Sequence, residues 1–196
     1  LIHTVHDVLR VEKLEGDAVL LSATPENPET FALTLIDRLQ NIFQAFHQRI
    51  HELAFCRTCF CDCCNQMGQL KVKAIAHYGN FLVKEVLGLR ELAGQEVIRA
   101  HRLLKNDLES DEYLLLTQNV IQLGEVEGSL EVHPHIEQDP QLGTTQGWVH
   151  YPPNHSVFEG EDSESYLVRV RQMQEFFRHQ RERSTLVNRP LETLTR

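Results

Sequence analysis

The residues with the clearest capacity for chemistry are five cysteines, all of which lie between Cys56 and Cys64. Thiolates are preferred ligands of Zn²⁺, and four of them can complete a tetrahedral structural site that leaves no open position for a substrate. The candidate ligands are Cys56, Cys59, Cys61 and Cys64. Two other interpretations stay open, reduced thiols and a local disulfide, and His47 or His51 could replace one thiolate.

A second group of candidates consists of charged residues at turn and helix positions. Asp17 follows Gly16 between two apolar, strand-like runs, which predicts a hairpin with a carboxylate at its tip. Arg102 and Lys105 lie one turn apart in a segment of helical periodicity. Each has an ordinary interpretation, as a turn residue or a solvated helix face, beside a functional one. We expect His77 to be a packed, hydrogen-bonded histidine rather than an acid–base group.

Composition narrows the classes of function. The chain has 196 residues, 41% of them hydrophobic, and a net charge of −9. The acidic balance argues against general binding to nucleic acid or to anionic membranes. No apolar run approaches the ~20 residues of a membrane helix, and no signal peptide is visible. Together with the clustered cysteines, these features predict a cytoplasmic protein. Motifs for serine or cysteine nucleophiles, glycine-rich phosphate loops and dinucleotide binding are absent from the sequence.

Hydrophobic periodicity predicts the elements that must position these residues. The expected elements are a helix end at 1–9, a hairpin of strands 10–14 and 18–22, a long helix ending near 55, a strand 70–78 with a partner strand 80–86, a helix 95–105, a buried strand 113–117, a polar strand 124–132, a strand 147–151 and a C-terminal helix 165–183. Strands and helices interleave, which is typical of an α+β fold.

We expect one domain over residues 1–132 and a C-terminal extension over 133–196, rich in loops but with one helix. The segment 133–135 is expected to be a loop. Because the chain opens in what resembles the second half of a helix, the first strand and helix of the domain are expected to lie upstream of Leu1.

Four motifs occur in one order along residues 1–117. They are Gly16-Asp17, Cys59-x-Cys61-x-x-Cys64, His77-x-Gly79 and the "HRLLKN" segment His101–Asn106. As a set, they resemble the catalytic domain of the class III adenylyl/guanylyl cyclases, and most of all an uncharacterised bacterial branch of that superfamily. The resemblance implies a ferredoxin-like, split βαβ sheet rich in antiparallel pairs. It also implies a homodimer with its site between two chains.

The same resemblance implies roles for individual residues. Asp17 would bind Mg²⁺ or Mn²⁺ in contact with the nucleotide phosphates, beside a second aspartate upstream of Leu1. Lys13 and Glu91 would read adenine, and Lys105 would add a nucleotide contact. Arg102 would be the catalytic group that stabilises charge on the transferred phosphate. One position departs from the pattern, because Ile98 stands where the family has the asparagine that bonds the ribose.

The expected function is therefore that of a nucleotide cyclase-like domain that binds a purine nucleoside triphosphate, ATP in preference, with a divalent metal. If it is active, it would be an adenylate cyclase. Ile98 keeps an alternative open, a non-catalytic regulatory or dimerisation module with a degenerate nucleotide site. The cysteines keep another open, a zinc-binding interaction domain.

Overall fold

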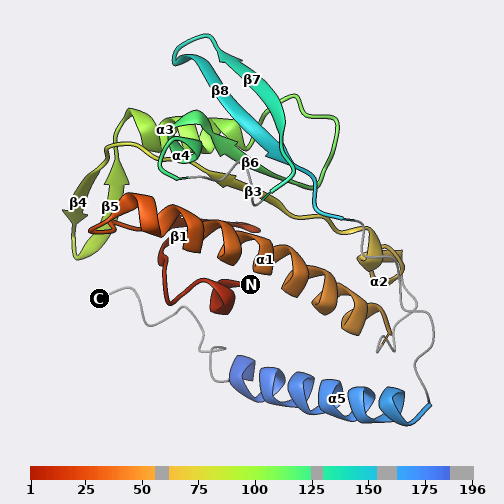
Figure 1. The fold of residues 1–196 in the computed structure, drawn as a ribbon. Helices are drawn as coiled ribbons and strands as arrows, with labels where there is room; N and C mark the ends of the chain where they lie inside the picture. The colour runs from red at the N-terminus through yellow and green to blue at the C-terminus, as the bar shows by residue number, and fades with distance from the viewer. Residues whose placement is uncertain (56–61, 125–129, 154–162, 186–196) are drawn as a thin grey trace. The chain divides into compact units, whose positions relative to one another are not determined.

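The computed structural model describes residues 1–55, 62–124, 130–153 and 163–185 (Figure 1). The chain divides into two compact units, which we describe separately. The first comprises Leu1–Gln48 with Leu70–His155, and the second comprises Arg49–Gln69 with Ser156–Arg196. Residues 133–150 belong to the first unit.

Strands β1 (Arg10–Glu15) and β2 (Ala18–Ser22) form the predicted hairpin. Glu15 pairs with Ala18, so Gly16 and Asp17 are the two turn residues. Gly16 has a φ of +65°, a conformation that glycine adopts without the steric cost of a Cβ. The glycine therefore has a backbone reason to be there, whatever the role of the carboxylate beside it.

A four-stranded sheet with the order β3-β6-β8-β7 forms the centre of the first unit (Figure 1). Its strands are β3 (Lys73–Ala76), β6 (Tyr113–Thr117), β7 (His133–Asp139) and β8 (Gly143–His150). β3 and β6 are parallel, whereas the β6–β8 and β7–β8 pairs are antiparallel. Helices and mainly antiparallel strands confirm the α+β class.

Two sequence-based expectations about this sheet are wrong. The partner of β3 is β6, and not the segment 80–86 that follows β3 along the chain. Residues 133–135 are not a loop, because they begin β7 and pair with residues 147–149 of β8. β7 is an edge strand, where a proline such as Pro134 is tolerated. Most of the expected strand 124–132 lies outside the described residues.

Strand β6 joins two apolar clusters, one on each face of the sheet. Successive side chains of a strand point to opposite faces. Leu114 and Leu116 pack in a large cluster with residues of helix α1, whereas Tyr113 and Leu115 pack with Leu103 and Val149. Burial on both faces explains why the segment is a continuous apolar run rather than an alternating one.

Helix α1 (Pro28–Phe55) begins three residues before the first position of its predicted apolar pattern, Phe31. Asn27 caps it, since its Oδ1 accepts hydrogen bonds from the backbone N–H groups of Glu29 and Thr30, at 3.1 Å and 3.2 Å. Pro28 occupies the first helical position, where its missing N–H does no harm. The buried side chains along α1 are Ala32, Ile36, Leu39, Ile42, Phe43 and Ile50.

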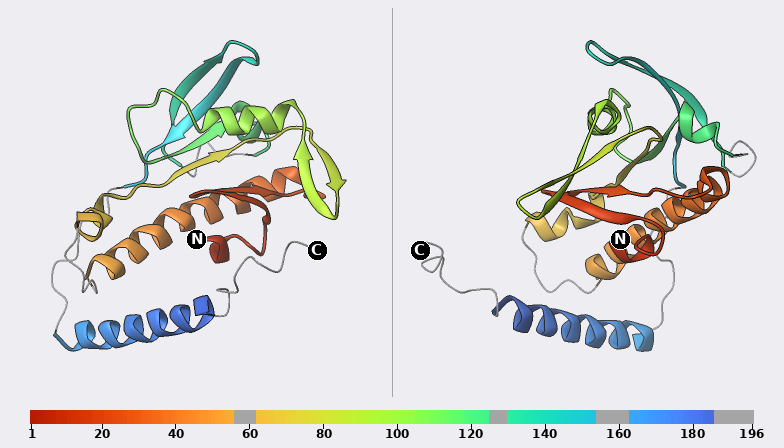
Figure 2. Two further views of the ribbon diagram at one scale, coloured as in Figure 1. Left: turned by 180° about the vertical axis from the view of Figure 1, so that it is seen from behind. Right: turned by 90° about the vertical axis from the view of Figure 1, so that its left-hand side faces the viewer.

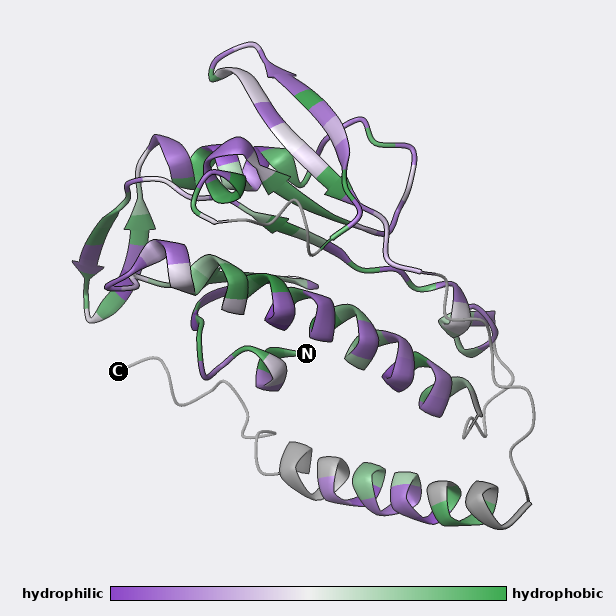
Figure 3. Cartoon of the chain, in the orientation of Figure 1, coloured by the Kyte–Doolittle hydropathy of each residue, from purple (hydrophilic) through white to green (hydrophobic). Residues whose placement is uncertain are grey.

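A separate hairpin of β4 (Leu82–Val86) and β5 (Leu89–Ala93) carries an apolar tip (Figure 3). Its turn residues, Leu87 and Gly88, both have positive φ, which is the pattern of a type I′ turn. The remaining elements of the first unit are η1 (Ile2–Thr4), α3 (Gln95–Leu103) and α4 (Gln118–Ile121).

The second unit contains the end of α1, with α2 (Asp62–Asn65), η2 (Met67–Gln69) and α5 (Ser163–Thr185). The guanidinium carbon of Arg49 lies 4.5 Å from the centre of the Phe176 ring, a cation–π contact. Among the described residues, no helix combines the length and apolar character needed to cross a membrane.

Candidate functional site

Strands β7 and β8 continue beyond the end of β6 as a two-stranded arm. Gly147 is the first residue of β8 that pairs with β6. Residues 136–139 of β7 and 143–146 of β8 therefore pair only with each other, and residues 140–142 join them. We call these residues the β7–β8 arm, and Figure 2 shows it from two further sides. Between the arm and α3 lies a groove of about 410 Å³. Its charged lining residues are Arg99, Arg102, Lys105, Asp107, Glu137 and Asp139. With three cationic side chains and three carboxylates, the lining of the groove has no net charge.

Arg102 is held by the arm. Its Nη1 donates to both carboxylate oxygens of Asp139, at 2.7 Å and 2.6 Å, and its Nη2 donates to Oε1 of Gln141. Asp139 also accepts the backbone N–H groups of Gln141 and Leu142, each at 2.8 Å. One carboxylate therefore closes the turn of the arm and binds the arginine of α3.

The environment of Asp139 stabilises its charged form. The hydrogen bond from Arg102 is the largest influence, partial desolvation opposes it, and the two backbone N–H groups reinforce it, so that the pKa of Asp139 falls to about 2. The carboxylate is consequently ionised at neutral pH.

Arg99, one turn before Arg102, makes a second connection to the arm. Its Nη1 donates to Oγ1 of Thr145 at 2.7 Å, and its Nη2 donates to the carbonyl of Leu142 at 3.2 Å. Its Nε donates to Glu96 at 3.1 Å. Helix α3 thus holds the arm through two arginines on one face.

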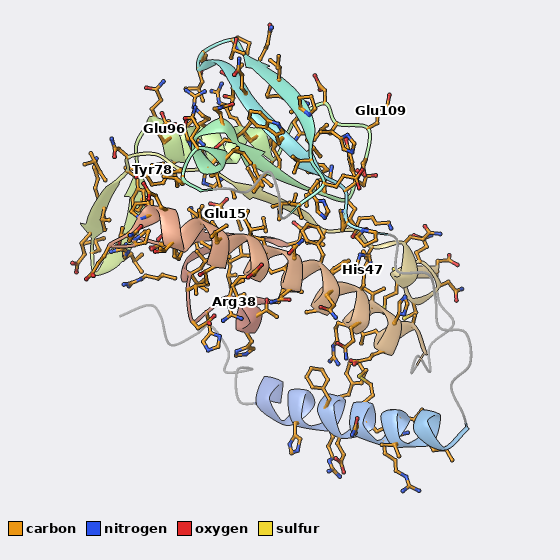
Figure 4. The ribbon with its side chains drawn as sticks, in the orientation of Figure 1. Glu15, Arg38, His47, Tyr78, Glu96 and Glu109 are labelled. Atoms are coloured by element: carbon orange, nitrogen blue, oxygen red, sulfur yellow. The ribbon has the colours of Figure 1, made fainter. Side chains whose placement is uncertain are left out.

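Glu96 connects this face to the sheet through His77. The His77 Nε2 lies 2.6 Å from Oε2 of Glu96, and its Nδ1 lies 2.9 Å from Oγ1 of Thr117. Figure 4 labels Glu96 at α3. Burial raises the pKa of Glu96, but the hydrogen bonds and charges of His77 and Arg99 outweigh it and lower that pKa overall.

The order Thr117, His77, Glu96 has the connectivity of a nucleophile, a base and an orienting carboxylate. Thr117 is nevertheless buried, with 2% of its surface exposed, so a substrate cannot reach its hydroxyl. We therefore interpret these three hydrogen-bonded side chains as a structural connection between β3, β6 and α3. This agrees with the expectation of a hydrogen-bonded His77.

Gly79 is required by the close approach of Glu96. A Cβ at this position would lie 2.6 Å from Cγ and 2.9 Å from Cβ of Glu96. Any larger residue would displace the glutamate from His77 and Arg99. The His77-x-Gly79 motif therefore has a packing explanation inside the site.

Strand β1 contacts both β5 and α3, which are distant from it in sequence. Glu12, the extra residue of a bulge in β1, accepts a hydrogen bond from Nε of Arg90 on β5 at 2.9 Å and one from Ser22 at 2.6 Å. Glu15 lies 3.5 Å from Nδ1 of His101 on α3. Burial raises the pKa of Glu12, but the hydrogen bonds from Arg90 and Ser22 lower it further than burial raises it.

The two residues expected to read adenine lie on the strands that this contact joins. Lys13 and Glu91 directly follow the bonded residues Glu12 and Arg90, and both are exposed. Lys13 forms a 3.1 Å ion pair with Glu15. Their strands are thus neighbours, although the described contacts include none between Lys13 and Glu91 themselves.

Asp17 lies at the hairpin tip, as predicted, and its side chain is exposed. A hard divalent cation needs several oxygen ligands, and one carboxylate supplies too few. In the part of the chain that the structure describes, no three His, Cys, Asp or Glu side chains are grouped to hold a metal. The described residues of one chain therefore do not form a complete cation site around Asp17.

The zinc prediction falls largely outside the described residues, because Cys56, Cys59 and Cys61 are not among them. Cys64 lies in α2 and is half-buried, and its neighbour Cys63 is exposed. A zinc site at these thiols stays a prediction.

Two more predicted positions lie on or near α3. Ile98 is 50% exposed, so an apolar side chain lies at the surface. This is the position at which the resemblance to the cyclases implies an asparagine. Lys105 is exposed and lines the groove. Sequence reasoning missed Asp139, Glu96 and Arg99, which together organise this face. The turn-forming pair Asp139-Pro140 before Gly143 was the available signal, since it marks a tight connection between two strands.

These features define an α+β protein in which the cationic face of a helix is covered by a β arm. Residues 1–113 match the family described as "Protein of unknown function (DUF2652)", and the chain belongs to this family. An uncharacterised protein of Mycobacterium tuberculosis, Rv2561/Rv2562, is 35% identical over 114 residues, 58% of this chain and 52% of the relative. The chain thus spans about half the length of that relative. No solved structure matches this chain.

Proposed function

We propose that this chain is a cytoplasmic, nucleotide cyclase-like domain that binds a purine nucleoside triphosphate, ATP in preference, together with Mg²⁺ or Mn²⁺. If it is catalytic, the 3′-oxygen of the ribose attacks the α-phosphorus, pyrophosphate leaves, and cyclic AMP forms. In this proposal the α+β fold has the ferredoxin-like arrangement of the class III cyclases, and two copies of the chain form the site.

The observation that carries the proposal is the meeting of β1, β5 and α3. The Glu12–Arg90 and Glu15–His101 contacts bring together three segments that are separated in sequence. These are the segments that carry the candidate purine-reading and phosphate-binding residues. The neighbourhood of these elements supports the proposal, because a shared site requires the segments that build it to be close in space.

Each candidate residue has a chemistry that suits its role. Lys13 can donate to N1 of adenine and Glu91 can accept from its N6 amino group. Arg102 has the planar fork that matches phosphate oxygens, and Lys105 adds an exposed positive charge. Asp17 would share the metal ion with the phosphates, and a second carboxylate would have to complete the site.

A second candidate function is a non-catalytic nucleotide-binding or dimerisation module. Two observations favour it. Ile98 cannot bond a ribose hydroxyl, so the 3′-oxygen would lack one of its positioning groups, and misalignment lowers rates by orders of magnitude. In addition, Arg102 is already bound to Asp139.

One experiment separates these functions. The purified chain is incubated with ATP and Mn²⁺, cyclic AMP is quantified, and the melting temperature is measured with and without nucleotide. Cyclic AMP identifies a cyclase, whereas a nucleotide-dependent rise in melting temperature without product identifies the binding module. Absence of both results contradicts the nucleotide proposal.

Purine selectivity gives a sharper test. Lys13→Glu replaces the proposed donor to adenine N1 by an acceptor, so the preference should move from ATP toward GTP. Lys73→Glu on β3 makes the same charge change at a residue whose described contacts are with Asp111 and Tyr113, and should leave the ATP/GTP ratio as it is.

A further inference from the structure

The guanidinium of Arg102 is already occupied in this structure. Three of the hydrogen bonds that it donates go to the arm, two to Asp139 and one to Gln141. A phosphate group would bind Arg102 through the same fork of N–H donors, because carboxylate and phosphate oxygens satisfy it with similar geometry. Asp139 and a phosphate ligand therefore compete for one group.

The competing carboxylate is well organised for this role. The two backbone N–H groups of Gln141 and Leu142 hold Asp139 at the turn, so little freedom is lost when it meets Arg102. Because it belongs to the same chain, its effective concentration at Arg102 is high.

The contact is also weak enough to be displaced. The side chain of Arg102 is 39% exposed and that of Asp139 is 19% exposed, so solvent screens the pair. Residues 136–146 of the arm, moreover, are not paired with β6, and side chains of α3 hold them. Release of Arg102 need not disturb the four-stranded sheet.

We propose that the β7–β8 arm is a tethered competitor of the phosphate site, in which Asp139 occupies Arg102 until a polyphosphate ligand displaces it. This inference rests on the proposed nucleotide function for the identity of the ligand, but not for the contact itself. With Asp139 bound, the groove is electrically balanced. An anion that binds Arg102 would also meet Lys105, which is exposed and lines the same groove. The family match ends at Tyr113, so a residue inside the matched region is controlled by a segment outside it.

The test compares Asp139→Asn with the unchanged protein. Asparagine has nearly the same shape, and its oxygen can still accept the N–H groups of Gln141 and Leu142. Calorimetric titrations with inorganic triphosphate, ATP and CTP measure affinity. We expect Asp139→Asn to bind triphosphate about fivefold more tightly, since a charged competitor is lost.

Two further variants isolate the contact. Glu137→Gln removes the same charge from the same groove without touching the Arg102 contact, and should raise affinity less than twofold. The double variant Arg102→Ala, Asp139→Asn should show none of the fivefold gain. Circular dichroism and melting curves verify that each variant is folded.

The outcomes distinguish this inference from the function on which it rests. Equal triphosphate affinity in the unchanged protein and in Asp139→Asn overturns the arm's role and leaves the nucleotide proposal standing. A gain for triphosphate in Asp139→Asn, with ATP bound no better than CTP, supports the arm's role and contradicts purine binding. Absence of anion binding in both proteins overturns both ideas.

Discussion

Two arginine–carboxylate pairs in the first unit have similar bond lengths and different surroundings. Arg90 donates to Glu12 at 2.9 Å and Arg102 donates to Asp139 at 2.6 Å. The Glu12 side chain is only 3% exposed, whereas that of Asp139 is 19% exposed at the edge of a groove. Each pair joins segments that are distant in sequence, so each could hold the fold together.

The difference in exposure separates their roles. A buried carboxylate that loses its partner keeps the penalty of desolvation, so the Glu12–Arg90 pair must stay closed. The Asp139–Arg102 pair is reached by water, and water can replace either partner at low cost. A buried pair therefore fixes structure, while a more exposed pair of similar length can act as a reversible contact.

The largest expected effect is the loss of the buried pair. Arg90→Ala leaves Glu12 with Ser22 and the more distant Arg10, and should lower the free energy of unfolding by about 2 to 3 kcal/mol. In a chain of this size the melting temperature should fall by about 4 to 12 °C, measured by differential scanning calorimetry.

Arg10→Ala is the matched control, because Arg10 also faces Glu12, at 3.8 Å, but is 65% exposed. It should change the free energy of unfolding by less than about 0.5 kcal/mol. Equal losses for the two arginine variants would show that burial of Glu12 does not decide the strength of the pair.

Of the four residues in these two pairs, the sequence identifies only Arg102 as a candidate. The β1–β2 hairpin, helix α1 and strand β6 follow from local signals: an alternating pattern around Gly16, a helical period after Asn27, and an apolar run. The Glu12–Arg90 and Arg102–Asp139 contacts join residues 78 and 37 positions apart, and no local pattern encodes such a distance.

The absence of a local signal for distant contacts also explains why the predictions of the sheet were wrong. The parallel β3–β6 pairing requires a crossover, and its register is set by packing against α1 rather than by the strands themselves. β7 lacks an apolar alternation because its residues are largely exposed at an edge. Arg102 was identifiable as a candidate, but its partner lies in this unpredicted strand.

A steric change tests the connection between the sheet and the groove. Gly79→Ala would place its Cβ within 2.6 Å of Cγ of Glu96, which must move and weaken its bonds to His77 and Arg99. We expect a loss of about 1 to 2 kcal/mol in the free energy of unfolding from urea titration. Gly68→Ala is the control, since nothing lies within 4 Å of its added Cβ.

Acidification tests the charged state of Asp139. The pKa values of Glu12 and Asp139 are both lowered in the folded protein, that of Asp139 to about 2. An unfolded aspartate titrates near 3.9, so the stability that Asp139 contributes is complete above about pH 4 and is lost as the pH falls toward 2. In urea titrations at several pH values, Asp139→Asn should flatten the stability profile between about pH 4 and pH 2, by the same small amount that the substitution costs at neutral pH. An unchanged slope in that interval would contradict the assignment.

The smallest expected effect concerns the exposed pair at neutral pH. Asp139→Asn removes the charge but keeps the turn's hydrogen bonds, and the screened contact contributes little to folding. Its melting temperature at pH 7 should therefore lie within about 2 °C of that of the unchanged protein. A fall as large as that of Arg90→Ala would mean that the arm is a structural brace, since a contact that expensive to open cannot yield to a ligand. A small fall, together with tighter binding of triphosphate, is the combination that only a reversible contact produces.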